Sequence, residues 1–128
     1  MPWVEIVMAL ALVQYLYFGA LVSSARGRYG IKAPAVQGHE MFERLYRVQM
    51  NTLELLVVFL PSLWLAAKYW SPVWMAGVGA VYLVGRMVYL RAYRLSPAGR
   101  SLGFTLSALP ALGLLGGGLV GAVLAAFK

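Results

Sequence analysis

The chain has 128 residues, of which 62% are hydrophobic, and its formal net charge is +7. A chain this short and this apolar cannot bury its hydrophobic surface as a water-soluble globule. We therefore expect the bilayer to be its solvent. It contains no cysteine, which excludes a disulfide, a thiolate metal site and a cysteine nucleophile. Its basic residues do not form a soluble basic face, so we expect no nucleic-acid partner.

Four continuous apolar stretches are each long enough to cross a hydrocarbon core, which takes about 20 helical residues. Because the stretches are continuous and not alternating, they predict helices and not the strands of a barrel. The expected fold class is an all-α integral membrane protein, a four-transmembrane-helix up-down bundle that forms a single domain over residues 1–128. We expect the helices at about residues 2–25, 40–69, 71–94 and 101–127.

The first apolar stretch lacks a positive n-region and a convincing cleavage site, so we expect a retained helix and not a signal peptide. The connection that follows, RGRYGIKAPAVQGHE (Arg26–Glu40), contains helix-breaking glycines and a proline and predicts a loop. Where helix resumes, Glu40 with Arg44 and Glu43 with Arg47 are acid-to-base pairs four residues apart. Such pairs support a first helical turn.

Most basic residues lie in or beside the first and third connections. The second connection and the C-terminus carry only Lys68 and Lys128. The positive-inside rule therefore predicts that loops one and three are cytoplasmic and that both termini face outward.

Polar side chains stand at membrane depth on the second and third helices. Arg47, Asn51 and Glu54 lie at i, i+4 and i+7, which places them on one stripe of the second helix. Between Arg47 and Glu54 the helix rises about 10 Å, so the stripe runs from the interface into one leaflet. The other helices bring further polar groups to the same leaflet: Arg86, Tyr89 and Tyr93 on the third, Arg26 at the end of the first and Arg100 at the start of the fourth.

Two interpretations of these groups are open. They could form ion pairs, such as Glu54 with Arg86 between helices and Glu43 with Arg47 within one helix, or they could bind a ligand, since intramembrane ionisable groups mark functional sites. Ion pairs would leave arginine in excess over the single deep carboxylate, which favours an anionic ligand. Arginine binds carboxylates in bidentate fashion, and Glu54 would accept an ammonium. The groups therefore describe a small zwitterion with two carboxylates and one amine.

The segment ERLYRVQMNTLELLVVFLPSLWLAA, followed by VYLVGRMVYLRAY, resembles the MAPEG superfamily, the membrane-associated proteins in eicosanoid and glutathione metabolism. The resemblance is to its leukotriene C4 synthase and microsomal glutathione S-transferase branches and extends from about Tyr15 to Leu124. The short C-terminus is typical of a bacterial member, for which the inner membrane is the expected location. The resemblance implies a homotrimer with glutathione bound between neighbouring subunits on the cytoplasmic side.

The resemblance also implies a role for each polar residue. Arg100 matches the arginine beside the glutathione sulfur and is the expected catalytic residue, because it would stabilise the thiolate. Glu54 would meet the α-amino group of glutathione, and Arg86 matches an arginine at the base of the site. The full set implied to bind glutathione is Arg47, Asn51, Glu54, Arg86, Tyr89, Tyr93 and Arg100 of one subunit, with Arg26 and Gln49 of the adjacent subunit.

The expected function is a membrane-bound glutathione S-transferase that conjugates hydrophobic electrophiles, with a role in detoxification and with lipid hydroperoxide reduction as a side activity. Glutathione would be the co-substrate, and no metal is implied. Leu55 and Gly27 stand where leukotriene C4 synthase has a tyrosine and a second arginine, which argues against specific leukotriene C4 synthesis. Two alternatives stay open: a non-catalytic lipid-binding scaffold of the lipoxygenase-activating type, and a small proton-coupled exporter that uses Glu54.

Overall fold

The computed structural model describes residues 1–128, apart from the side chain of Pro97. Its elements are the helices α1 (Pro2–Tyr29), α2 (Glu40–Tyr69), α3 (Pro72–Leu95) and α4 (Ser101–Ala126), with a short 3-10 helix η1 (Pro97–Arg100) before α4. In the described chain, four helical segments are long and apolar enough to cross a membrane, the last of them including the end of η1. The expected all-α membrane class is confirmed.

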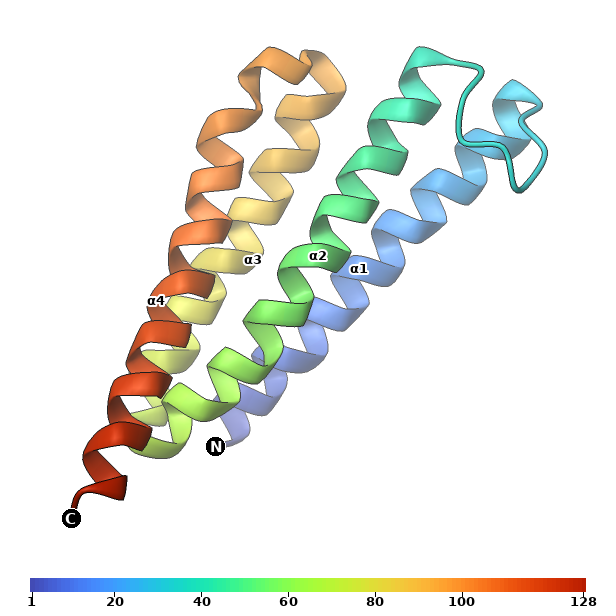
Figure 1. Cartoon of the computed structure of the whole chain (residues 1–128). Helices are drawn as coiled ribbons and strands as arrows, with labels where there is room; N and C mark the ends of the chain where they lie inside the picture. Colours follow the sequence, from blue (N-terminus) through green and yellow to red (C-terminus); the bar gives the residue numbers. More distant parts are fainter.

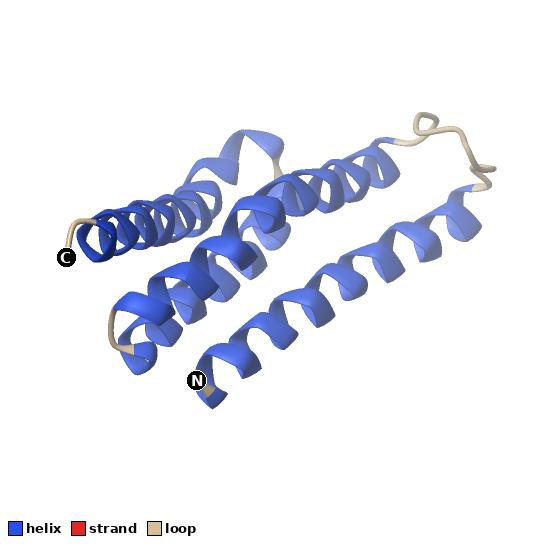
Figure 2. Ribbon diagram, turned by 60° about the horizontal axis from the view of Figure 1, so that its bottom comes forward, coloured by secondary structure: helices blue, strands red, loops and turns tan.

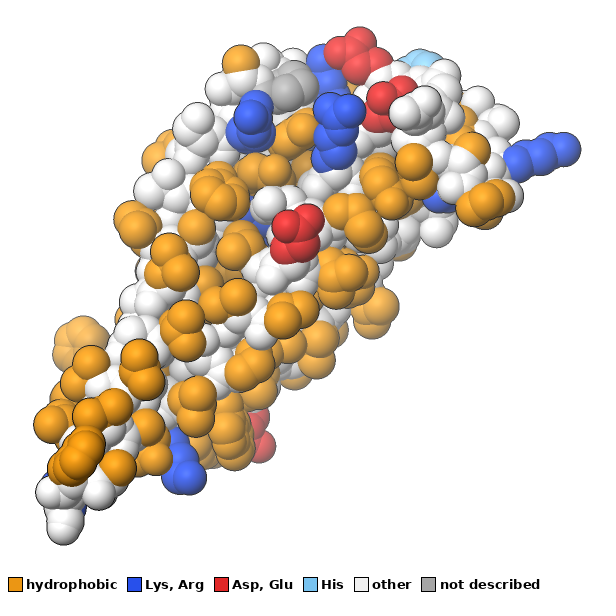
Figure 3. Space-filling view, viewed as in Figure 1, with side chains coloured by type: hydrophobic (Ala, Val, Ile, Leu, Met, Phe, Trp, Pro, Cys, Tyr) orange, Lys and Arg blue, Asp and Glu red, His pale blue; other side chains and the backbone are white. Residues whose placement is uncertain are grey.

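The four helices run up and down, with both termini at the end of the bundle that carries the α2–α3 turn (Figure 1). The loop 30–39 and the turn 96–100 lie at the other end, which we call the basic end because Lys and Arg side chains gather there (Figure 3). Both α1 and α4 pack against α2 and α3. Figure 2 shows α1 and α4 on opposite flanks of the bundle.

Helix α1 extends one turn beyond the predicted end at about residue 25. Gly27 does not interrupt it, because a single glycine inside a helix costs only about 1 kcal/mol. Gly30 does end it, because this residue adopts the left-handed conformation with a φ of 68°, which glycine reaches without a steric penalty. Arg26 therefore lies inside the last turn of α1 and not at the start of the loop.

His39 caps the N-terminus of α2. Its Nδ1 atom accepts a hydrogen bond of 3.1 Å from the backbone N–H of Met41, which satisfies one of the free donors of the first turn. The His39 ring also stacks on Tyr29 at the end of α1, with the ring centroids 3.6 Å apart. The stacking holds the end of α1 close to the start of α2, on either side of the loop 30–39.

Only one of the two predicted pairs in the first turn of α2 forms. Glu40 and Arg44 make an ion pair. Glu43 instead accepts a hydrogen bond of 3.2 Å from the backbone N–H of Gly38. The predicted pairing of Glu43 with Arg47 was wrong because the loop folds back and supplies a nearer donor.

The interior contains two apolar clusters separated by a polar layer. The cluster toward the termini includes Leu56 of α2 and Tyr82 of α3, and the cluster toward the basic end includes Val48 of α2 and Tyr89 of α3. Between these two levels lie three buried polar residues, Thr52, Arg86 and Ser107, and the partly buried Asn51. We call these four residues the polar layer.

Gly103 brings the backbones of α3 and α4 into contact beside the polar layer. A Cβ atom at Gly103 would lie 2.4 Å from both the Cα and the backbone N of Tyr89. We therefore expect Gly103→Ala to lower the free energy of unfolding in detergent micelles by about 1–3 kcal/mol, because one backbone must move.

Gly113→Ala on the same helix is the matched control for this prediction. An added Cβ at Gly113 would meet nothing within 4 Å. Because alanine is the better helix former, we expect this variant to be neutral or slightly stabilised. Equal losses in the two variants would contradict the close packing at Gly103.

Candidate functional site

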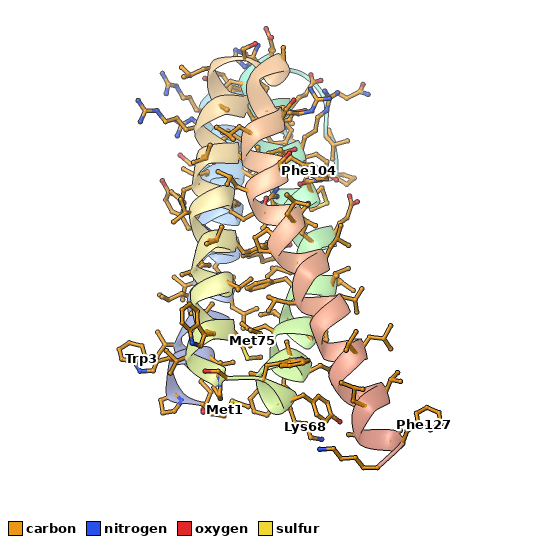
Figure 4. The ribbon with its side chains drawn as sticks, turned by 90° about the vertical axis from the view of Figure 1, so that its left-hand side faces the viewer. Met1, Trp3, Lys68, Met75, Phe104 and Phe127 are labelled. Atoms are coloured by element: carbon orange, nitrogen blue, oxygen red, sulfur yellow. The ribbon has the colours of Figure 1, made fainter. Side chains whose placement is uncertain are left out.

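A cavity of about 560 Å³ opens near the basic end, between α2, α3 and the η1–α4 segment. Its volume is in the range of small-molecule sites, about 300–1,000 Å³. Figure 4 shows Phe104, one of its lining residues, in the half of the bundle nearer the basic end. The lining residues are Asn51, Tyr89, Ala98, Arg100, Ser101, Phe104 and Thr105. Three residues predicted from the sequence, on three different elements, thus meet at one cavity.

Arg86 lies behind the cavity wall and is fully buried. Its Nε and Nη2 atoms donate hydrogen bonds of 3.0 Å and 2.7 Å to Ser107 Oγ. Its Nη1 atom donates to Asn51 Oδ1 at 2.7 Å and to Thr52 Oγ1 at 3.1 Å. The guanidinium carbon also lies 4.3 Å from the centroid of the Tyr89 ring. All of these partners are neutral, so the charge is stabilised by dipoles but is not cancelled.

The alternative ion pair between Glu54 and Arg86 does not form. Glu54 is exposed, and no carboxylate of the described residues makes an ion pair with Arg86. An uncancelled positive charge in a low-dielectric interior raises the potential of the adjacent cavity. The cavity therefore favours an anionic ligand.

Asn51 connects Arg86 to the cavity. The Asn51 Oδ1 atom faces the guanidinium, so the amide nitrogen of this side chain points elsewhere and keeps its two donors. Asn51 lines the cavity, whereas Arg86 does not. Arg86 therefore influences a ligand through the orientation it imposes on Asn51 and through its charge.

Tyr89 and Arg100 line the cavity, and Tyr93, which does not line it, lies beside both of them. Tyr89 and Tyr93 are buried, and their ring centroids lie 5.5 Å apart. The guanidinium carbon of Arg100 lies 6.0 Å from the centroid of the Tyr93 ring. Arg100 itself is exposed and directly precedes α4. Its charge and the positive end of the α4 dipole act on the same part of the cavity.

Arg47 and Glu54 lie outside the cavity, on the same stripe of α2 as Asn51. Both side chains are exposed, and neither lines the cavity. They stand about 10 Å apart along the helix axis, with Asn51 between them. Both therefore lie on the outer surface of α2, one on each side of Asn51 along the helix axis.

Arg26 and Gln49 lie away from the cavity of their own chain. Arg26 Nη1 donates a hydrogen bond of 2.6 Å to the carbonyl of Ala35, and its guanidinium carbon lies 4.9 Å from the centroid of the Phe42 ring. Gln49 packs against α1, because its Nε2 atom lies 3.0 Å from where a Cβ would stand on Gly19. The structure does not bring these two residues to the other predicted site residues.

Sequence reasoning missed Thr52 and Ser107, which hold Arg86. Both are hydroxyl residues in apolar helices, which was the only available signal. That signal is ambiguous, because such hydroxyls often bond only their own helix, and Ser107 Oγ does donate to the carbonyl of Gly103 at 2.7 Å. Whether such a hydroxyl also accepts a hydrogen bond from Arg86 depends on how the neighbouring helix packs, which the sequence does not show.

Comparison with known proteins shows which family the chain belongs to. The MAPEG family model matches residues 4–120 of the chain. An uncharacterized protein of Synechocystis sp. is 44% identical over 118 residues, which covers 92% of this chain and 86% of that protein. Human microsomal glutathione S-transferase 2 is 38% identical over 101 residues (79% and 69%), and bovine leukotriene C4 synthase is 37% identical over 118 residues (85% and 78%). The resemblance drawn from the sequence is confirmed, and this chain belongs to the MAPEG family.

Proposed function

We propose that this protein is a membrane-bound glutathione S-transferase, which binds glutathione as a co-substrate and activates its thiol for attack on a hydrophobic electrophile. The observation that carries the proposal is the cavity lined by Asn51, Tyr89 and Arg100 beside the uncancelled charge of Arg86. Glutathione has two carboxylates and one amine, so it needs more cationic than anionic partners. The relatives named microsomal glutathione S-transferase and leukotriene C4 synthase support the same ligand.

Glutathione would lie partly in the cavity and partly along α2. Glu54 would accept hydrogen bonds from its ammonium group, Arg47 would bind a carboxylate, and Asn51 would donate to its backbone. Arg26 and Gln49 would come from the adjacent subunit of a homotrimer. Their position away from the cavity of their own chain suits that arrangement.

Arg100 would be the catalytic residue. A free thiol has a pKa of about 8.5, and a neighbouring arginine or a helix N-terminus lowers that pKa. Since the guanidinium stays protonated, Arg100 would stabilise the thiolate without accepting its proton, which would pass to water. The sulfur would then form a bond to an electrophilic carbon as the leaving group departs or an epoxide opens. With a lipid hydroperoxide, the thiolate would attack the terminal oxygen, the O–O bond would break to release the alcohol, and the resulting sulfenic acid would react with a second glutathione to give the disulfide and water.

We also propose that the protein lies in a bacterial inner membrane with its basic end toward the cytoplasm. Basic residues concentrate at one end of the bundle, which suits a cytoplasmic position for that end in a bacterial inner membrane (Figure 3). Glutathione would then reach the cavity from the cytoplasm, and an apolar electrophile would arrive through the bilayer.

Calorimetric titration with glutathione tests the proposal. We expect saturable binding to the purified full chain and about tenfold or greater weakening in Glu54→Gln, because a hydrogen bond between charged partners contributes about 1.5–3 kcal/mol. Glu5→Gln, an exposed carboxylate of α1 at the opposite end, should leave the affinity unchanged. Absence of saturable binding would contradict the proposal and favour the scaffold or the exporter.

A further inference from the structure

A second cavity lies between α1 and α3 and shares no lining residue with the candidate glutathione cavity. It is a groove of about 1070 Å³, which we call the α1–α3 groove. Apolar side chains form its walls, among them Val13 of α1 and Val84 and Met87 of α3. These three side chains are 59%, 60% and 45% exposed, so the groove opens on the outside of the bundle. Its walls suit a hydrocarbon ligand.

The floor of the α1–α3 groove is closed by a contact between the two helices. Gln14 Nε2 donates a hydrogen bond of 2.9 Å to the carbonyl of Leu83, and both residues line the groove. The amide nitrogen of Gln14 is thus engaged within the protein, and its Oε1 atom is buried without a hydrogen-bond partner in the described chain. Because that oxygen is buried, the surface that the groove offers at this level is formed mainly by the apolar side chains named above.

The length of the α1–α3 groove matches one leaflet. Along α3 it extends from Leu83, near the middle of the helix, to Leu95 at its end. Twelve residues at about 1.5 Å each give about 18 Å. One leaflet contributes about 15 Å of hydrocarbon, half of a core that is about 30 Å thick. The α3 wall thus covers the depth of one leaflet, the leaflet at the basic end, whereas the α1 wall, from Leu10 to Tyr17, borders the deeper part of the groove.

Two arginines line the end of this groove at the membrane surface. Arg91 and Arg94 are three residues apart, so they lie on neighbouring parts of one face of α3. Both are exposed, and neither forms an ion pair with any described carboxylate. Arg44 lies nearby, because its Nη1 donates a hydrogen bond of 3.0 Å to the carbonyl of Arg94, but its charge is paired with Glu40, so Arg91 and Arg94 are the cations available to a ligand. Figure 4 shows nitrogen-tipped side chains projecting outward at this end of the bundle.

We propose that the α1–α3 groove binds one anionic phospholipid of the surrounding leaflet. An acyl chain would lie between α1 and α3 beside Val84, and the phosphate would bind Arg91 and Arg94. The apolar walls, the length of one leaflet and the pair of uncompensated cations at its surface end match the three parts of such a lipid. Each arginine near an anionic surface contributes about a few-fold in affinity, so the pair should prefer an anionic lipid about tenfold over a zwitterionic one.

Native mass spectrometry of the full chain in detergent tests this site. The probes are phosphatidylglycerol and phosphatidylcholine with identical acyl chains. We expect about tenfold greater retention of phosphatidylglycerol, and loss of that preference in R91Q/R94Q. The matched control R28Q/K32Q removes two exposed basic residues at the same end that do not line the groove, and it should retain the preference.

A second pair of variants tests the apolar part. Val84→Trp fills the groove and should lower retention of both lipids several-fold. Val73→Trp is the control, because Val73 of α3 is exposed to a similar extent, 65% against 60% for Val84, but lies outside the groove. Unchanged melting temperatures in all variants would show that folding is intact.

Several outcomes would overturn the lipid assignment. Equal retention of the two lipids, or a preference that survives R91Q/R94Q, would remove the role of the arginines. Full competition by inorganic phosphate would indicate a site for a free anion. If Val84→Trp altered the oligomeric state while lipid retention stayed constant, a second copy of the chain would occupy the groove. If it stopped conjugation while lipid retention stayed constant, the groove would belong to the electrophile.

Discussion

Replacing Arg100 with alanine is expected to slow glutathione conjugation about tenfold or more at pH 7 while glutathione still binds. Arg100 lines the cavity at the start of α4 and supplies a positive charge that favours the thiolate over the thiol. Without that charge, the thiol pKa of bound glutathione rises toward about 8.5, and the thiolate fraction at pH 7 falls. Steady-state rates with a chlorinated aromatic electrophile, together with calorimetry for binding, would measure the two effects separately.

The pH dependence of this loss gives a sharper test. Because the thiolate forms above the thiol pKa, the deficit of Arg100→Ala should be largest near neutral pH and should shrink as the pH rises above about 9. Arg28→Ala, an exposed arginine at the same end that does not line the cavity, is the control and should keep normal turnover. Unchanged turnover in Arg100→Ala, or a deficit independent of pH, would remove Arg100 from the catalytic role.

Ser107→Ala is expected to lower the free energy of unfolding by about 3 kcal/mol. Ser107 Oγ is the acceptor for both Nε and Nη2 of Arg86, and the guanidinium is fully buried. Removing this oxygen leaves two donors of a charged group without partners, and each such donor costs about 1–3 kcal/mol. Reversible unfolding in mixed detergent micelles would measure the loss. Ser71→Ala, an exposed serine whose side chain makes no capping bond, should be neutral.

A double-mutant cycle with Arg86→Met separates this mechanism from simple packing. Once Arg86 is replaced by a neutral side chain of similar length, Ser107→Ala should cost little, because no charged donor depends on Ser107. Arg86→Met should also weaken glutathione binding, because Asn51 loses the partner that orients its amide. Strictly additive losses of stability would contradict the role of Ser107 as the partner of Arg86.

In the proposed glutathione complex, the stability of the fold and the affinity for glutathione would depend on the same contacts of the polar layer. Arg86 is held by Ser107 of α4 and by Thr52 and Asn51 of α2, and of these only Asn51 lines the cavity. The close contacts of Gly103 with the backbone of Tyr89 and of Gly85 with the backbone of Ser107 hold α3 and α4 at the distance across which Ser107 reaches Arg86. A change that separates α3 from α4 should therefore affect both folding and glutathione affinity.

The class of the protein and the number of membrane-spanning helices could be predicted from the sequence alone. The reason is that a bilayer requires every backbone polar group to be satisfied within the segment, so long apolar stretches leave helices as the only solution. The stripe of Arg47, Asn51 and Glu54 could also be predicted, because helical periodicity is local. The face on which a residue lies follows from the period of its own helix, so predicting it requires no knowledge of the neighbouring helices.

The partners of these side chains could be decided only by the tertiary structure. The sequence left an ion pair of Arg86 with Glu54 open, and the structure pairs Arg86 with Asn51, Thr52 and Ser107. Periodicity states which residues share a face of one helix, but it does not state how that helix is rotated toward its neighbours. Here close backbone contacts at Gly103 and at Gly85 set α3 against α4 beside Ser107, and the packing of α2 against α3 places Asn51 and Thr52, and not Glu54, next to Arg86.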